Sequence, residues 1–159
     1  MREIKLNTIE IAGETYPIYC DLYVLEQIQE RMSLNQFERD LIGAVPEKDN
    51  NGKIIRKEDG TIKLVFDEYK IKSIMMALTL MINEGINIEN EVNGKELEPV
   101  NEKYIMRVWQ GSLAEVSKIL HDEFNRCFEV KKNTDPVKPE SRKRKTSRST
   151  SQGSTSSED

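Results

Sequence analysis

Residues 71–85 constrain the fold more than any other part of the sequence, because they hold the most apolar helical pattern in the chain. Apolar side chains recur there every three or four residues, as on one face of a helix. The stripe consists of Ile71, Ile74, Met75, Leu78, Met81 and Ile82. We expect Asp67 to open this helix, Gly85 to end it, and the helix to lie at the centre of the fold.

The same helix has a second apolar side. At about 100° per residue, Met76 and Leu80 fall nearly opposite the main stripe. A second apolar side needs a second cover, which either the rest of the chain or another protein would provide. Met76 and Leu80 are therefore candidate partner-binding residues, with packing inside the chain's own core as the alternative.

Hairpin and helix-capping signals place further elements around this helix. Short apolar runs flank a turn at Ala12, Gly13 and Glu14, which predicts an N-terminal β-hairpin, and Pro17 favours an edge position for its second strand. Four residues stand where the N-caps of further helices are expected: Asp21, Ser33, Asn101 and Ser112. We expect Tyr104, Val108 and Trp109 to face inward from the third of these helices.

Residues 47–66 interrupt the helical pattern with a polar stretch. Asn51-Gly52 and Asp59-Gly60 are turn signals, and Leu64 and Phe66 alternate with other residues after the second. So few apolar residues cannot support an independent domain. The sequence predicts a projecting hairpin or loop here.

The expected fold class is α+β, with the N-terminal hairpin packed on a bundle of four or five helices. A chain of 159 residues suits a single domain, which we place at residues 1–130. Apolar residues are nearly absent after Val130, so we expect residues 131–159 to form a disordered tail rich in basic residues, Ser and Thr.

Charge is distributed unevenly along the chain. The net charge is -4, yet the part from Lys131 onward has 8 Lys/Arg and 4 Asp/Glu, which leaves -8 for the remainder. An acidic body does not attract nucleic acid, so only the tail would contact a polyanion. The candidate residues are Arg142, Lys143, Arg144 and Lys145. They lack interleaved aromatic residues, which favours a solubilising tail over a nucleic-acid arm.

Cysteine usage and hydropathy favour the cytosol. Cys20 and Cys127 lie within or beside apolar segments, so we expect buried free thiols, with a disulfide as the alternative. The N-terminal residues lack the apolar region of a secretion signal. No stretch approaches the roughly 20 apolar residues that span a bilayer, so no membrane association is expected.

Residues for catalysis or metal binding do not converge in the sequence. His121 is the only histidine, and a metal site needs three or four ligands, so we expect a solvated histidine. Acid pairs such as Glu84 and Glu89 fall in what reads as a polar connection, without apolar neighbours to raise a pKa. No glycine-rich phosphate loop or nucleophile motif occurs. We expect no enzyme activity, no cofactor and no metal.

The order of the elements and several local sequences together carry a family resemblance. The hairpin is followed by DLYVLEQIQE at residues 21–30, a short helix at 34–43, IKSIMMALTLMINEG at 71–85 and LHDEFNRCF at 120–128. In the order of these elements and in their residue patterns, residues 4–130 resemble the tail assembly chaperones of long-tailed phages and prophages of Gram-positive bacteria. The resemblance carries no functional residue across one by one.

The resemblance implies a small cytosolic protein that escorts the long helical tape-measure protein. Such a chaperone helps tail-tube subunits polymerise around the tape-measure protein and leaves before the tail matures, so it is absent from the virion. Family members often have a longer frameshifted product. The sequence leaves a homo-oligomer open. It also leaves open a nucleic-acid-associated or protein adaptor acting through residues 142–145, and a structural tail-completion protein.

Overall fold

The computed structural model describes residues 4–133, with side chains described as far as Glu129. The predicted polyanion contacts Arg142, Lys143, Arg144 and Lys145 lie outside the described residues. The chain divides into two units, residues 1–124 and residues 125–159. Each is described by itself, and the described part of the second unit is the end of one long helix.

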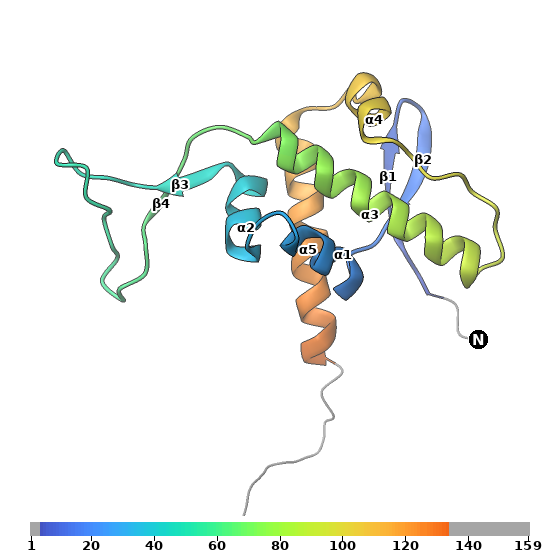
Figure 1. Cartoon of the computed structure of the whole chain (residues 1–159), viewed down its shortest axis with the longest axis horizontal. Helices are drawn as coiled ribbons and strands as arrows, with labels where there is room; N and C mark the ends of the chain where they lie inside the picture. Colours follow the sequence, from blue (N-terminus) through green and yellow to red (C-terminus); the bar gives the residue numbers. More distant parts are fainter. Residues whose placement is uncertain (1–3, 134–159) are drawn as a thin grey trace, which may run out of the picture. The chain divides into compact units, whose positions relative to one another are not determined.

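The fold is α+β, as predicted, and an N-terminal hairpin lies beside the central helix of the first unit (Figure 1). The described strands are β1 (Asn7–Ile11), β2 (Glu14–Ile18), β3 (Ala44–Pro46) and β4 (Leu64–Phe66). The described helices are α1 (Leu22–Gln29), α2 (Leu34–Ile42), α3 (Ile71–Glu91), α4 (Glu102–Val108) and α5 (Leu113–Asn133). The strands pair as two antiparallel sheets, β1 with β2 and β3 with β4.

The β1–β2 hairpin turns where the sequence predicts. Ile11 pairs with Glu14, and Ala12 and Gly13 between them have φ angles of 52° and 82°. Two consecutive positive φ angles define the type I′ turn, whose twist matches that of the flanking strands. Ile9, Ile11 and Ile18 are buried beneath the hairpin, so this two-stranded sheet depends on the helices for a core.

The capping signals of α1 and α2 are confirmed. The Asp21 carboxylate accepts a hydrogen bond from the Val24 amide at 3.0 Å, and the Ser33 hydroxyl accepts one from the Gln36 amide at 3.1 Å. Gly43 ends α2 in the left-handed conformation with φ 70°. These bonds satisfy amides that a helix start otherwise leaves unpaired, so each boundary follows from local chemistry.

Helix α3 is the centre of the first unit, and it packs against β2, α1, α2 and α4. Its predicted stripe is buried, with the exception of Ile71, whose side chain is 50% exposed at the first turn. Side chains that α3 buries completely are Ile74, Ala77, Leu78, Met81 and Ile82. Burying several aliphatic side chains of this size contributes roughly 1.5–3 kcal/mol each before entropy is counted.

Both predicted ends of α3 are wrong. The helix begins at Ile71 instead of Asp67, because the Asp67 amide donates to the Gly43 carbonyl at 2.8 Å and so continues the β3–β4 ladder. It continues past Gly85 to Glu91. A Cβ at Gly85 would lie 2.8 Å from the backbone of Pro17. Gly85 therefore allows close packing of α3 on β2, and the predicted connection after residue 87 begins as helix.

The capping signals of the last two helices are also confirmed. Asn101 accepts from the Tyr104 amide at 3.1 Å, and the Ser112 hydroxyl accepts from the Glu115 amide at 3.0 Å. The seven-residue α4 buries only Ile105. The prediction that Tyr104 faces inward is wrong, because its side chain is 46% exposed. Helix α5 runs to Asn133, three residues past the predicted domain boundary at 130.

Residues 44–66, hereafter the arm, contain the projecting element predicted at residues 47–66, but they form more than one hairpin. The Glu47 amide donates to the Lys63 carbonyl, the Lys63 amide to the Ile55 carbonyl, and the Ile55 amide to the Glu47 carbonyl, at 2.8, 3.0 and 2.9 Å. Three chain segments thus meet in a closed ring of hydrogen bonds, from which β3–β4 and two short hairpins branch (Figure 1).

Candidate functional site

The second apolar side of α3 is largely covered by the chain itself. Met76 is only 3% exposed and Leu80 is half-buried. For Met76 the structure thus agrees with the second alternative, packing within the chain's own core, and α3 contacts β2, α1, α2 and α4 of the first unit. Partner binding at Leu80 stays a prediction, and a binding surface has to be sought elsewhere.

The arm carries the densest group of uncovered apolar side chains on neighbouring residues. All three residues of β4 are exposed: Leu64 by 38%, Val65 by 37% and Phe66 by 61%. Ile54, on the first short hairpin, is 44% exposed. The ring of Phe66 has a T-shaped contact with Tyr69 at a centroid distance of 5.0 Å. These four residues, Ile54, Leu64, Val65 and Phe66, are called the arm patch below.

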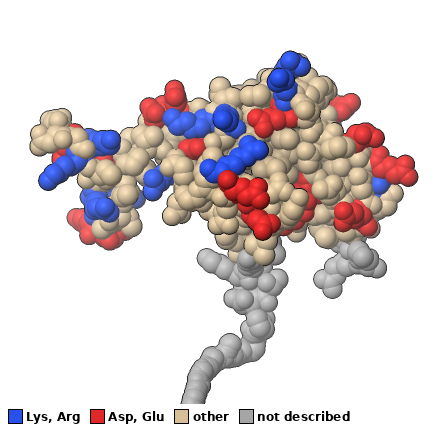
Figure 2. Space-filling model, in the orientation of Figure 1, with Lys and Arg blue, Asp and Glu red and all other residues tan. Residues whose placement is uncertain are grey.

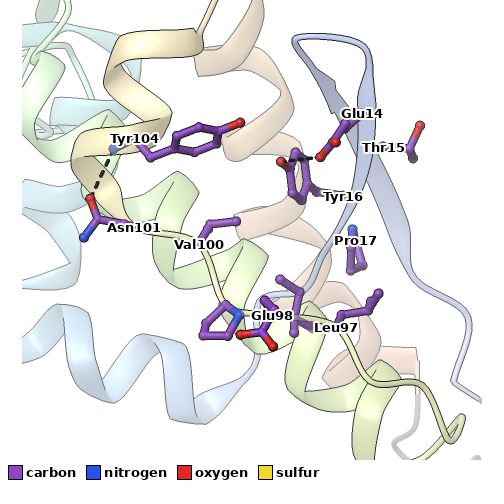
Figure 3. Close-up of a pocket in the computed structure, with 11 residues that line it drawn as sticks. Glu14, Thr15, Tyr16, Pro17, Leu97, Glu98, Val100, Asn101 and Tyr104 are labelled. Carbon is purple, nitrogen blue, oxygen red and sulfur yellow. Dashed lines mark hydrogen bonds between the residues drawn. The ribbon is translucent and has the colours of Figure 1, made fainter.

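A groove of about 460 Å³ lies between β2, the connection after α3, and α4 (Figure 3). Its walls are mainly apolar, and Leu97 and Tyr104 on its border are 40% and 46% exposed. The lining residues on the described chain include Glu14, Tyr16, Pro17, Ile86, Glu98 and Val100. Sequence reasoning missed this groove because its two sides come from residues about eighty positions apart.

Tyr16 and Glu14 form the polar end of this groove. The Tyr16 hydroxyl donates to the Glu14 carboxylate at 2.9 Å. Partial burial and this acidic neighbour raise the pKa of Tyr16 to about 12. Tyr16 therefore stays a neutral hydrogen-bond donor to Glu14 at the edge of β2.

Charged side chains differ between the two ends of the first unit. Figure 2 shows basic and acidic side chains mixed over the arm and the middle of the molecule, while acidic side chains predominate at the opposite end. That end includes residues 84–98, which contain five Glu and a single Lys. The Lys95 ammonium is paired with Glu89 at 3.0 Å, so it offsets little of this negative charge beyond its own partner.

Glu123 of α5 is a buried carboxylate that the sequence does not reveal as special. It is 2% exposed, accepts a hydrogen bond from the Asn7 amide group at 2.8 Å, and accepts another from the Cys20 backbone amide at 2.9 Å. It joins three segments far apart in sequence. These bonds account for the burial of a charged residue type and give Glu123 a structural role.

Glu84 lies on α3, so the expectation that it occupies a polar connection is wrong. Burial and, after it, the nearby Asp21 carboxyl together raise the pKa of Glu84 to about 7. No group of three or more His, Cys, Asp or Glu side chains suited to a metal ion occurs within the described residues.

The single histidine is less solvated than the sequence predicts. The ring nitrogen Nε2 of His121 lies 2.8 Å from a carboxylate oxygen of Glu38 on α2, and the His121 side chain is 27% exposed. Cys20 and Cys127 are buried, as expected, and the two are not joined in a disulfide. His121 thus contributes to the packing of α5 on α2.

Among the helices of residues 4–133, none combines the length and the hydropathy needed to cross a membrane. Comparison of the chain with protein-family models, curated proteins and solved structures finds no match. The uncovered surfaces of the arm and the groove are the candidate binding sites of the described residues.

Proposed function

We propose that this protein is a tail assembly chaperone of a long-tailed phage or prophage, which binds the tape-measure protein and promotes polymerisation of tail-tube subunits around it. The observation that carries the proposal is the arm patch, in which Phe66 is 61% exposed on a projecting element. Consecutive exposed apolar side chains do not stabilise a monomer, whereas a chaperone needs them to bind the apolar surface of its partner. That the partner is the tape-measure protein is what the family resemblance of residues 4–130 implies.

The arm suits reversible capture of an apolar helical stripe. Its backbone ring between Glu47, Ile55 and Lys63 holds the strands without a hydrophobic core of their own, so apolar side chains remain free to contact a partner. Exposed Lys53 and Lys63 directly precede Ile54 and Leu64 in the chain, and their charged ends help to keep the arm in water. In this proposal the protein acts in the host cytosol, is no enzyme, and leaves before the virion is complete.

The proposal is tested by co-expression with the tape-measure protein. Replacing both Leu64 and Phe66 by Ser would remove up to about 3 kcal/mol of contact from each side chain, so we expect recovery of the complex to fall more than tenfold at limiting concentration. The matched control is Leu22→Ser, because Leu22 is 58% exposed on α1 but lies off the arm. Equal recovery of the complex with both variants would contradict the proposal.

The alternatives make different predictions for truncation. Removal of the residues after Val130 should leave binding of the tape-measure protein intact if the arm binds it. An adaptor working through residues 142–145 would lose all polyanion binding in the same variant. A structural tail-completion protein would be found in purified particles, whereas a chaperone would not.

A further inference from the structure

Strand β2 has a free outer edge. In a hairpin with a two-residue turn, Ile11 and Glu14 form a hydrogen-bonded pair, and hydrogen-bonded pairs then alternate along the ladder. In the register observed, Thr15 opposes Glu10 and Pro17 opposes Thr8 as non-hydrogen-bonded pairs. The backbone groups of Thr15 and Pro17 therefore point away from β1.

One end of this edge is covered and the other is open. Pro17 lies against Gly85 of α3, and the Tyr19 amide donates to the Met81 carbonyl at 3.0 Å. Pro17 itself has no amide to donate. At Thr15 the outward amide and carbonyl have no hydrogen-bond partner within the described part of the chain. An unpaired edge of this kind is a template for another strand.

The groove continues from this open edge. Its cavity of about 460 Å³ begins at Glu14–Pro17 and is bounded on the far side by Leu97, Val100 and Tyr104 (Figure 3). Side chains of an added strand alternate in direction. An apolar side chain at every second position would therefore enter the cavity, while its neighbours face the border of the groove.

Charge favours a basic occupant. Glu14 and Glu98 belong to the lining itself, and residues 84–98 add a strong excess of Glu over Lys. The only Lys of that segment is already paired with Glu89. An acidic segment would be repelled from this border, whereas Lys or Arg side chains would be attracted.

We propose that the edge of β2 and its adjacent groove bind an extended segment of another polypeptide, with aliphatic and basic residues in alternation, by adding it as a third strand to the β1–β2 sheet. The proposal goes beyond the chaperone function above, because it rests on the hairpin and the groove and not on the arm. Main-chain bonds to Thr15 hold the segment, and the groove selects its side chains.

The test uses the full chain and a fluorescein-labelled hexapeptide, Lys-Val-Lys-Val-Lys-Val, with fluorescence anisotropy as the readout. We expect saturable binding at physiological salt. A Glu-Val hexapeptide of the same pattern should bind at least tenfold more weakly because of the acidic border. A Lys-Val peptide with N-methyl groups on alternate amides should also lose binding, because it cannot pair along a strand edge.

Two variants locate the binding site. Thr15→Pro removes the outward amide, and Pro17 already occupies the equivalent outward position on the same strand, so the fold should accept the change while affinity falls about fivefold. Thr8→Pro is the matched control on the outer edge of β1 and should leave affinity unchanged. Leu97→Ser, in an exposed connection, should weaken binding about fivefold without altering the melting temperature.

Several results would overturn the proposal. These are absence of binding by the native chain, equal affinity for the Lys-Val and Glu-Val peptides, or equal effects of Thr15→Pro and Thr8→Pro in folded proteins. If sedimentation shows that the native chain self-associates and Thr15→Pro makes it monomeric, a second copy occupies the edge and the proposal is likewise rejected. Leu97→Ser keeps the test decisive even if a proline variant fails to fold.

Discussion

Glu123 shows how much one buried polar side chain can organise. Its carboxylate is almost completely enclosed, and it receives bonds from the side chain of Asn7 and from the backbone of Cys20. A sequence pattern gives no signal for this role, because Glu123 follows Asp122 in what reads as the polar flank of an amphipathic helix. The role of Glu123 arises only in the folded protein, where Asn7 of the hairpin and Cys20 of the β2–α1 connection lie next to its carboxylate and donate hydrogen bonds to it.

Replacing Glu123 by Ala should destabilise the fold by about 3 kcal/mol. The substitution removes the Glu123 acceptor from the buried Cys20 amide, and an unpaired buried group costs about 1–3 kcal/mol. It also removes the bond from the exposed Asn7 side chain, which water can replace in part. Chemical denaturation of the two proteins measures the difference. Glu129→Ala, on an exposed position of the same helix, should change the stability by less than about 0.5 kcal/mol; a similar loss in both variants would disprove the role of Glu123.

In helix α3, the local sequence determines which side chains are buried, whereas tertiary contacts determine where the helix begins and ends. Its stripe of buried side chains follows directly from helical spacing. Its ends do not, because the start depends on the Asp67 amide bonding to Gly43 and the continuation depends on Gly85 meeting Pro17. Glycine inside a helix usually costs stability, so a sequence alone favours a stop at Gly85.

This packing predicts that Gly85→Ala destabilises the protein although alanine favours helix. Alanine would gain about 1 kcal/mol of helix propensity, but its Cβ would lie 2.8 Å from the Pro17 backbone, and such overpacking costs about 1–3 kcal/mol or more. We expect a lower melting temperature. Lys72→Ala, at an exposed position of α3, is the control and should be neutral, whereas a stabilised Gly85→Ala would refute close packing.

The candidate binding surfaces show the same division between local pattern and tertiary contact. Apolar residues of β4 are visible in the sequence, but their exposure is not, since an alternating strand normally buries one face. The groove at β2 depends on Leu97 and Tyr104 arriving from distant segments. Conversely, Met76 shows that an apolar residue off the main stripe can be covered by the chain's own elements.

At the scale of the whole molecule, an acidic chain with a partly buried carboxyl should show a distinct pH dependence. The pKa of Glu84 is raised to about 7 from an ordinary value of 4.5. At Glu84 the folded state therefore binds more protons than the unfolded state between these two values, and the contribution of Glu84 to the free energy of unfolding decreases as pH rises from 4.5 to 7.

Glu84→Gln removes this penalty. We expect the variant to be more stable than the native chain at pH 8, by on the order of 1 kcal/mol because solvent screens a group that is only partly buried. The difference should shrink below pH 7 and vanish near pH 4, as thermal melts at several pH values would show. Glu26→Gln, on an exposed position of α1, should give a difference that does not vary in this way.

The ring of backbone hydrogen bonds in the arm lies between the β3–β4 ladder and the two short hairpins. Each tip begins and ends at the ring, at Glu47, Ile55 and Lys63, so its length can change while the three-way junction keeps its geometry. Gly52 and Gly60, at the tips, have no neighbouring side chains within 4 Å of an added Cβ. The tips are thus suitable places to insert an epitope or a reporter peptide, and evolution has the same freedom to lengthen one of them.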